Sequence, residues 1–161
     1  MKKEKGFSLI ELLIVVAIIG IIAAIAIPNL LKSRQAANES SAIGSVRTLG
    51  TAQATYQATR GKGKDFCTTM ANLNAEGLVD SALASGQKSG YNFTCVGAVA
   101  TSTTPSIFDT TARPLSSGTF GTGNRSFYSN ETFVIYAQDG DVAIAAAAGT
   151  RVPAAPALPI E

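Results

Sequence analysis

Residues 7–31 form one long apolar stretch, FSLIELLIVVAIIGIIAAIAIPNLL, and the rest of the chain is arranged around it. From Leu12 to Ile27, 16 consecutive residues have neither a charge nor a strongly polar side chain. A helix needs about 20 such residues to cross the hydrocarbon of a bilayer, and the flanking apolar residues extend the run to that length. We therefore predict a membrane-spanning helix over residues 7–31.

One carboxylate interrupts the stretch. Glu11 would lie below the lipid headgroups, where an acidic side chain near a helix centre costs about 2.5 to 3.5 kcal/mol on insertion scales. Two explanations compete: Glu11 is protonated or reaches water at the edge of the span, or it has a cationic partner. No Lys, Arg or His lies between Lys5 and Lys32, so such a partner must come from outside the side chains of the span.

Residues 3–28, KEKGFSLIELLIVVAIIGIIAAIAIP, resemble the leader and N-terminal helix of the type IV pilins and the related pseudopilins. The resemblance is dense over about the first 35 residues of the 161 and weaker beyond. It implies that a prepilin peptidase cuts after Gly6 and methylates the new amino group of Phe7. It also implies that Glu11 meets the amino terminus of a neighbouring subunit, which would supply the missing cation.

The orientation of the span follows from the resemblance and from the cysteine pair described below. An apolar core of 16 residues is long for a secretory signal, and no small-x-small cleavage site ends it. The positive-inside rule is nearly undecided, since three lysines precede the span and Lys32, Arg34 and Arg47 follow it. Before assembly, we expect the chain to cross the inner (cytoplasmic) membrane once, with its bulk outside the cytoplasm. After assembly, we expect it to be part of an extracellular pilus.

The composition argues against an enzyme. The chain has no histidine, which removes the Ser-His-Asp and Cys-His catalytic arrangements. Only two cysteines are present, so a zinc site is not expected either. We predict no catalytic residue, no metal and no cofactor.

The two cysteines, Cys67 and Cys95, are 28 positions apart, without the close spacing of a metal or redox motif. Outside the cytoplasm such a pair favours a disulfide. Closing a loop of this size stabilises a domain by roughly 3 to 4 kcal/mol. We predict a structural disulfide between them.

The helix is expected to continue beyond the membrane, over residues 7–59. Its outer half has an apolar stripe at helical spacing, formed by Ala42, Ile43, Val46, Leu49, Ala52 and Tyr56. At 1.5 Å per residue such a helix would be about 80 Å long, so its outer half must pack on something. Pro28 and Gly20 weaken the inner half. The resemblance implies a flexible joint between them, because helices of assembled pili unwind there.

The remaining residues predict short helices and a small sheet. Gly77 and Gly86 end candidate helical turns. The best strand signal is an Asp139-Gly140 turn between two apolar-rich runs, which is typical of a type I′ hairpin. The predicted elements are helical turns at 69–76 and 81–85, strands at 91–96 and 106–111, a hairpin of 132–138 with 141–145, a loop at 113–124, and an extended, mobile Pro/Ala tail at 153–159.

Two binding sites have weaker support. Some pseudopilins bind calcium in C-terminal loops, and Asp139 and Asp141 flank a turn, but two aspartates are thin support for such a site. Basic residues outnumber acidic ones between residues 32 and 64, which suits anionic headgroups or nucleic acid but is equally typical of a solvated helix face. DNA binding therefore stays open.

The sequence as a whole predicts an α+β protein with three parts: a leader at 1–6, a long helix at 7–59 and a globular head at 60–161 with an antiparallel sheet of about four strands. Stacked helices of this kind would bury their apolar spans against each other, so the resemblance and the helix together predict a homo-oligomeric filament. Its expected partners are the prepilin peptidase, the pilus assembly machinery of the inner membrane, and the membrane itself before assembly. A pseudopilin of a type II secretion system, a membrane-anchored enzyme and an electron-conducting fibre are the alternatives.

Overall fold

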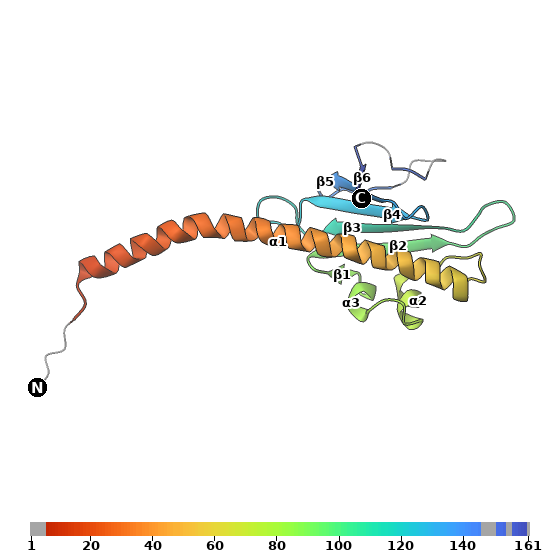
Figure 1. Cartoon of the computed structure of the whole chain (residues 1–161), viewed down its shortest axis with the longest axis horizontal. Coiled ribbons are helices and arrows are strands. Elements are labelled where there is room, and N and C mark those ends of the chain that lie inside the picture. The colour runs from red at the N-terminus through yellow and green to blue at the C-terminus, as the bar shows by residue number, and fades with distance from the viewer. Residues whose placement is uncertain (1–5, 146–150, 154–155, 161) are drawn as a thin grey trace, which may run out of the picture.

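The computed structural model describes residues 6–145, 151–153 and 156–160, and it has the predicted α+β architecture. Helix α1 (Leu9–Thr59) is 51 residues long, within two residues of the predicted start and ending at the predicted residue. Its inner half extends away from the head, and its outer half lies across the sheet (Figure 1). The other elements are α2 (Met70–Ala75), α3 (Ser81–Ala84), β1 (Gln87–Lys88), β2 (Tyr91–Ala98), β3 (Ile107–Pro114), β4 (Arg125–Asn130), β5 (Ile135–Asp139) and β6 (Leu158–Ile160).

The sheet has six strands in the order β1-β2-β3-β4-β5-β6, each antiparallel to its neighbours, rather than the four that we predicted. The two predicted strands in the first half, β2 and β3, are present and are longer than expected. Strand β4 was missed because five of its six residues are buried. A strand covered on both faces shows no alternation of polar and apolar residues, and alternation is the signal that the prediction used.

The predicted hairpin of 132–138 with 141–145 is wrong. Gly140 has a φ of +91° and the chain does turn there, but residues 141–145 form no strand. Both edges of β5 are already occupied, by β4 on one side and by β6 on the other. The turn is held to β4 instead, since Gly140 N donates to Asn124 O over 2.6 Å and Ser126 Oγ donates to Gly140 O over 2.7 Å.

The tail prediction is wrong at its end, and the loop prediction is wrong at its start. Two residues of the expected mobile tail at 153–159, Leu158 and Pro159, belong to strand β6 (Leu158–Ile160), which pairs with β5, while residues 154–155 lie outside the described part of the chain. The expected loop at 113–124 begins two residues later, because β3 extends to Pro114 and Arg113 pairs with Asn92. Residues 113–114 and 158–159 are therefore paired in the sheet, although their residue types alone predict irregular structure.

The two short helices lie where the sequence placed them, and each begins with an N-cap. Thr69 Oγ1 accepts from Asn72 N at the start of α2, and Asp80 Oδ1 accepts from Leu83 N at the start of α3. Both helices lie beside the outer half of α1, near the β1 edge of the sheet (Figure 1). Such side-chain acceptors satisfy donors that a helix start leaves unpaired.

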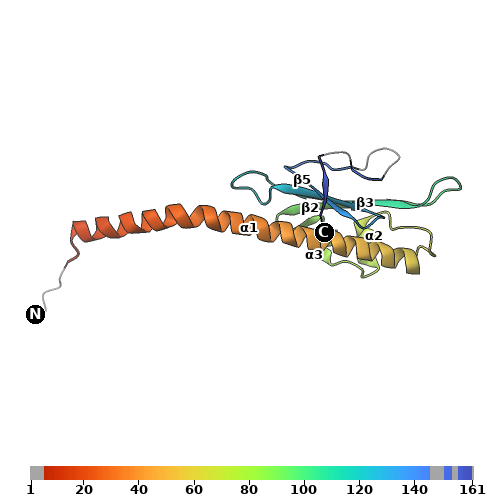
Figure 2. The ribbon, with the colours of Figure 1, turned by 45° about the horizontal axis from the view of Figure 1, so that its top comes forward.

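The main core lies between α1 and one face of the sheet (Figure 2). Of the predicted stripe, Ala42, Val46, Leu49 and Ala52 are buried, and Ile43 and Tyr56 pack against the core half-buried. Phe127 of β4 joins this core, whereas the next residue, Tyr128, points to the other face, as strand geometry requires. A second, small cluster there comprises Tyr128, Tyr136, Ile144 and Ala157.

Candidate functional site

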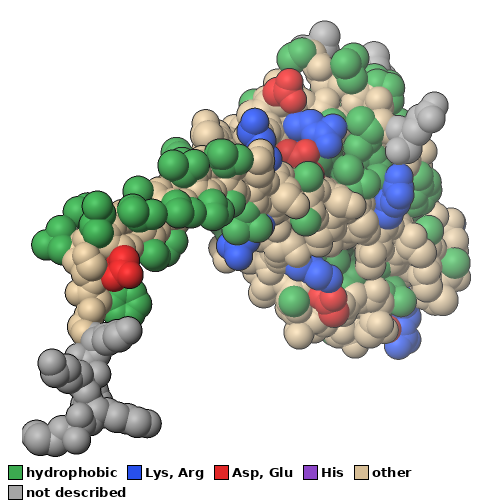
Figure 3. Space-filling model, turned by 60° about the vertical axis from the view of Figure 1, so that its left-hand side comes forward, with side chains coloured by type: hydrophobic (Ala, Val, Ile, Leu, Met, Phe, Trp, Pro, Cys, Tyr) green, Lys and Arg blue, Asp and Glu red, His purple; other side chains and the backbone are tan. Residues whose placement is uncertain are grey.

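The inner half of α1 is an apolar surface without a cover. Every large hydrophobic side chain from Leu9 to Leu30 is exposed, with Leu9 at 77% and Leu30 at 57%. Figure 3 shows these side chains around the helix between the head and the N-terminal end. By length and composition α1 could cross a membrane, and none of its most apolar 18-residue window is buried in the isolated chain. Exposed apolar area on this scale marks a membrane or protein contact.

Glu11 lies in the first turn of this helix and has a local partner that we did not predict. Ser8 is the N-cap residue, and its backbone N donates to Glu11 Oε2 over 2.8 Å. This is the reciprocal half of a capping box, which satisfies a donor at the helix start, and the negative charge lies at the positive end of the helix dipole. The Ser-x-x-Glu spacing was readable in the sequence. It gives Glu11 a role in addition to the predicted pairing.

Gly6 and Phe7 precede the helix in an accessible segment. Both lie before the first helical residue, Leu9, and Phe7 is 89% exposed. The structure therefore places the expected cleavage position outside regular structure and four residues before Glu11. Cleavage there would put the new amino group on Phe7, directly before the N-cap residue Ser8.

The expected joint between Gly20 and Pro28 is helical in this structure. Pro28 lies inside α1, and the helix is continuous from Leu9 to Thr59, with a gentle curve over its inner half (Figure 1). Proline removes one hydrogen bond of the helix ladder, and Gly20 is a poor helix former. Unwinding on assembly stays a prediction.

At the boundary between the two halves of α1, polar side chains attach the helix to the head. Glu39 accepts a hydrogen bond from Asn124 N over 2.9 Å, and its other oxygen pairs with Arg125 Nε over 2.8 Å. One turn earlier, Gln35 Nε2 donates to the carbonyl oxygens of Gly118 and Gly121. Gln35 and Glu39 are both buried. Both residues lie on the same side of the helix as the apolar core residues. Because glutamine and glutamate are polar, the sequence alone suggested that they face solvent.

Cys67 and Cys95 both contact the side chain of Gln53. The Gln53 side chain is fully buried, and its Nε2 donates both to Cys67 O over 2.9 Å and to Cys95 Sγ over 3.1 Å. Cys67 N donates in turn to Gln53 Oε1 over 2.7 Å. Both cysteines are buried free thiols here, and burial raises the pKa of the Cys95 thiol. The structure thus places both cysteines in contact with the same buried side chain, Gln53, but it does not contain the predicted disulfide.

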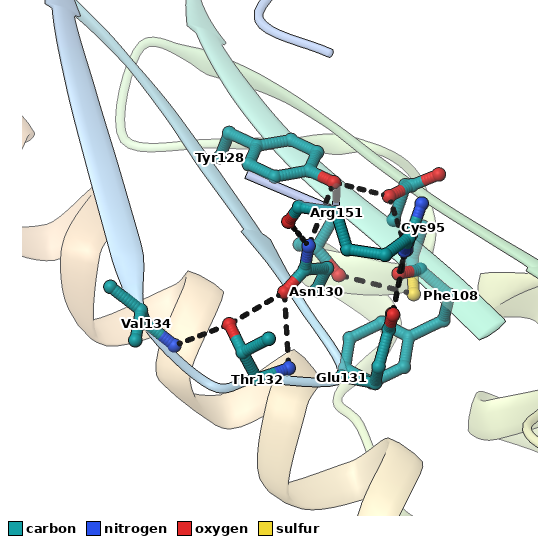
Figure 4. Close-up of polar contacts among 10 residues, drawn as sticks. Cys95, Phe108, Tyr128, Asn130, Glu131, Thr132, Val134 and Arg151 are labelled. Carbon is teal, nitrogen blue, oxygen red and sulfur yellow. Dashed lines mark hydrogen bonds and ion pairs between the residues drawn. The ribbon is translucent and has the colours of Figure 1, made fainter. Parts of the chain in front are cut away.

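A polar cluster on the outer face of the sheet holds part of the C-terminal segment (Figure 4). Arg151 pairs with Glu131 through Nε and Nη2, each at 2.6 Å, and with Asp109 at 2.9 Å. Asn130 is fully buried and donates to the backbone oxygen of Arg151, while its Oδ1 accepts from the backbone and hydroxyl of Thr132. The sequence did not predict this cluster, because Arg151 is 20 and 42 positions away from its acidic partners Glu131 and Asp109.

The Arg151 cluster predicts a pH dependence. Burial by itself would raise the pKa of Glu131, but the hydrogen bonds and charge of Arg151 outweigh it and hold that pKa below its ordinary value of 4.5. A lowered pKa stabilises the fold above 4.5, and this stabilisation is lost as the pH falls from 4.5 through the lower folded-state pKa. We expect Glu131→Gln to lower the free energy of unfolding at neutral pH by about 1 kcal/mol, the scale of a partly exposed ion pair, and to flatten its acid dependence.

The measurement is denaturant unfolding of the full chain in detergent at a series of pH values. Glu76→Gln serves as the control, because Glu76 also pairs with an arginine, Arg60, whose side chain is 65% exposed. An acid dependence that is identical in the wild type and Glu131→Gln would contradict the assignment to Glu131.

Among the described residues, no group of three or more His, Cys, Asp or Glu could hold a metal ion. Asp141, one of the two aspartates considered for calcium, is paired with Arg113 over 2.8 Å. Asp139 is the last residue of β5. Because the Arg113 guanidinium already pairs with the Asp141 carboxylate, the case for a calcium site at Asp139 and Asp141 is weaker.

Comparisons with known proteins agree with the N-terminal resemblance. The family model of the prokaryotic N-terminal methylation motif matches residues 1–27. The type IV major pilin protein PilA of Myxococcus xanthus is 47% identical over 64 residues, which are 40% of this chain and 29% of that protein. The type IV wide pilus major component PilA4 of Thermus thermophilus is 64% identical over 39 residues, 24% of this chain and 30% of that protein.

A secretion protein matches over a longer stretch at lower identity. The type II secretion system core protein G of Escherichia coli is 29% identical over 90 residues, 56% of this chain and 59% of that protein. The chain thus covers less than two thirds of the length of each of these relatives. No solved structure matches it significantly.

The N-terminal motif, the exposed apolar helix and the α+β head occur together in one chain, and its relatives are both pilins and a secretion core protein. The family model covers only the leader and the inner half of the helix, whereas the 90-residue match to the secretion core protein is longer than the leader and helix together and so includes part of the head. The N-terminal leader and helix of the chain are therefore those of a type IV pilin or pseudopilin.

Proposed function

We propose that this chain is the structural subunit of a type IV pilus, an extracellular filament for adhesion, motility or DNA uptake, and not an enzyme. The observation that supports it is the uncovered apolar half of α1, which has no partner within the described chain. The same side chains can contact lipid before assembly and the helices of neighbouring subunits afterwards. Burial of apolar surface stabilises contacts with neighbouring helices at roughly 25 cal/mol per Å² outside the membrane.

In this proposal the chain is made as a precursor in the inner membrane. The prepilin peptidase removes residues 1–6 and methylates Phe7, and the assembly machinery of the inner membrane then moves the subunit into the filament. The amine of Phe7 pairs with Glu11 of a neighbour, and the helix loosens between Gly20 and Pro28. The exposed position of Phe7 and the first-turn position of Glu11 support this order of steps.

A pseudopilin of a type II secretion system is the second candidate. It is favoured by the match to the secretion core protein, which extends over more of the chain than the matches to the pilins. The two pilins are the more similar relatives over the part that they cover. We therefore place the pilus subunit first.

The experiment is to delete the gene and compare surface fibres and secreted proteins with those of the parent strain. We expect the mutant to lose fibres, and we expect the main component of fibres sheared from the parent to be this chain by mass spectrometry. Loss of secreted enzymes with unchanged fibres would instead support the pseudopilin. Unchanged fibres and unchanged secretion would contradict both.

We also propose that Cys67 and Cys95 form a disulfide once the head is outside the cytoplasm. Their common contact with Gln53 supports it, since both cysteines lie at one buried locus. We expect alkylation of surface material without reductant to label neither cysteine, and replacing both by Ser to lower stability by roughly 3 kcal/mol. Because buried free thiols would also resist labelling, the alkylation is done in denaturant. Labelling of both thiols under that condition would contradict the bond.

A further inference from the structure

The loop between β3 and β4, residues 115–124, is the part of the head nearest to the span. In both ribbon views it extends from the sheet toward the uncovered half of α1 (Figures 1 and 2). Gln35 Nε2 donates to Gly118 O over 2.7 Å and to Gly121 O over 3.0 Å. Gln35 is four residues beyond Leu31, the last residue of the predicted span, and four residues of helix are about 6 Å long. With the span in a bilayer, this loop lies at the level of the membrane surface.

The loop has a fixed shape. Asn38 Nδ2 donates to Thr122 O, and Thr122 N donates to Ser116 O, each over 2.8 Å. A side chain at Gly121 would come within 2.4 Å of Ser116 O, so the close approach requires glycine there. Gly118 has a φ of +100°, a conformation that disfavours other residues. The helix and the loop's own hydrogen bonds therefore hold its tip in one place.

That tip presents an aromatic side chain to the outside. Phe120 is 80% exposed, and Leu115, at the start of the loop, is 47% exposed. Lys32 and Arg34 on the adjacent turn of α1 are exposed too. A surface cleft of about 510 Å³ lies beside the contacts between α1 and the loop, and Lys32 and Thr119 are among the residues that line it. No residue from 115 to 124 is acidic.

We propose that this loop rests on the anionic phospholipid surface of the outer leaflet in the unassembled subunit, with Phe120 inserted among the headgroups. The inference rests on the proposed function, since it requires the span to lie in a membrane. Aromatic side chains are favoured at the membrane interface, and lysine and arginine beside it are attracted to anionic lipid. A second contact with the membrane fixes the tilt of the head relative to the span. Entry into a filament then requires Phe120 to leave the lipid.

The chain has no tryptophan, so one substitution gives a site-specific fluorescent probe. Full-length Phe120→Trp is reconstituted at low density in vesicles of phosphatidylglycerol and phosphatidylethanolamine with brominated acyl chains, which quench tryptophan nearby. The matched control is Val99→Trp, because Val99 is also exposed, at 53%, but lies in the loop between β2 and β3 at the opposite end of the head (Figure 1). We expect quenching and a blue-shifted emission for Phe120→Trp and neither for Val99→Trp.

Equal emission at the two positions would overturn the inference. So would a blue shift of Phe120→Trp that grows with protein density and is insensitive to bromine, because that result indicates a second copy of the chain as the occupant. Ile18→Trp, in the middle of the span, separates the inference from the proposed function. Quenching of Ile18→Trp with none at Phe120→Trp overturns only the loop contact, whereas no quenching at Ile18→Trp overturns the membrane span that both require.

Discussion

Replacing Glu11 by Ala is expected to abolish surface fibres while leaving membrane insertion and cleavage after Gly6 largely intact. Cleavage creates a cationic amine at Phe7, and in an assembled filament this amine and the Glu11 carboxylate of a neighbour would both lie in an apolar environment. Removing one partner of a buried ion pair costs about 3 to 5 kcal/mol. Each added subunit would then bind more weakly by on the order of a hundredfold to a thousandfold.

The hydrogen bond from Ser8 N to Glu11 suggests a more discriminating variant. Glu11→Gln keeps an oxygen that can accept this bond but has no charge, so it retains the cap and loses the ion pair. We expect Glu11→Gln to impair fibres as Glu11→Ala does. Each variant is expressed as the sole copy, and processed protein in membranes is compared with fibres sheared from cells.

The outcomes separate the roles of Glu11. Normal fibre yield from Glu11→Ala would exclude any role in assembly. Normal yield from Glu11→Gln alone would assign the defect of Glu11→Ala to the lost helix cap. Loss of the processed protein as well as the fibres would place the role of Glu11 earlier, in insertion or in recognition by the peptidase.

Replacing Gln53 by Leu is expected to have the largest effect on the stability of the head. The side chain satisfies both Cys67 N and Cys67 O, and Cys67 is only 1% exposed. A buried donor or acceptor left without a partner costs about 1 to 3 kcal/mol, so the variant should lose about 2 to 5 kcal/mol. For a head of this size the melting temperature would fall by roughly 10 °C or more.

Gln57→Leu is the matched control, one turn further along α1. The Gln57 side chain donates over a long 3.4 Å to Lys64 O at an exposed site, so its loss should change stability by less than about 0.5 kcal/mol. Near-ultraviolet circular dichroism of the full chain in detergent follows the tyrosines of the head during heating. Equal melting temperatures for Gln53→Leu and the wild type would show that the buried bonds to Cys67 contribute nothing to stability.

The long helix and its apolar stripe could be predicted because a helix has a short, regular period. Ala42, Val46, Leu49 and Ala52 are buried as their spacing indicates. The polar members of the same stripe could not be recognised, since Gln35, Glu39 and Gln53 are buried only through partners that are distant in sequence. The hydrogen bonds that join Gln35 and Glu39 to residues 118–125, for example, connect residues 83 to 86 positions apart.

The second half of the sheet was less predictable for a related reason. Strand β4 is covered by α1 on one face and by the Tyr128 cluster on the other, so no alternation marks it. Strand β6 contains Pro159, and a proline normally argues against a strand. The proline is tolerated because β6 is the last strand in the sheet order and pairs with β5 on one side. The roles of Gly6, Phe7 and Glu11 stay predictions, and they could be inferred from the sequence because these residues lie close together along the chain and their spacing is itself the signal.

Mass spectrometry of the N-terminal peptide from sheared surface fibres tests the central claim most directly. If the chain is a processed filament subunit, the peptide begins at Phe7 and has the mass of a methylated amine. The apolar half of α1 would then have left the membrane as part of the fibre. A peptide that begins at Met1, in fibres composed of this chain, would contradict the processing and with it the pairing of the Phe7 amine with Glu11.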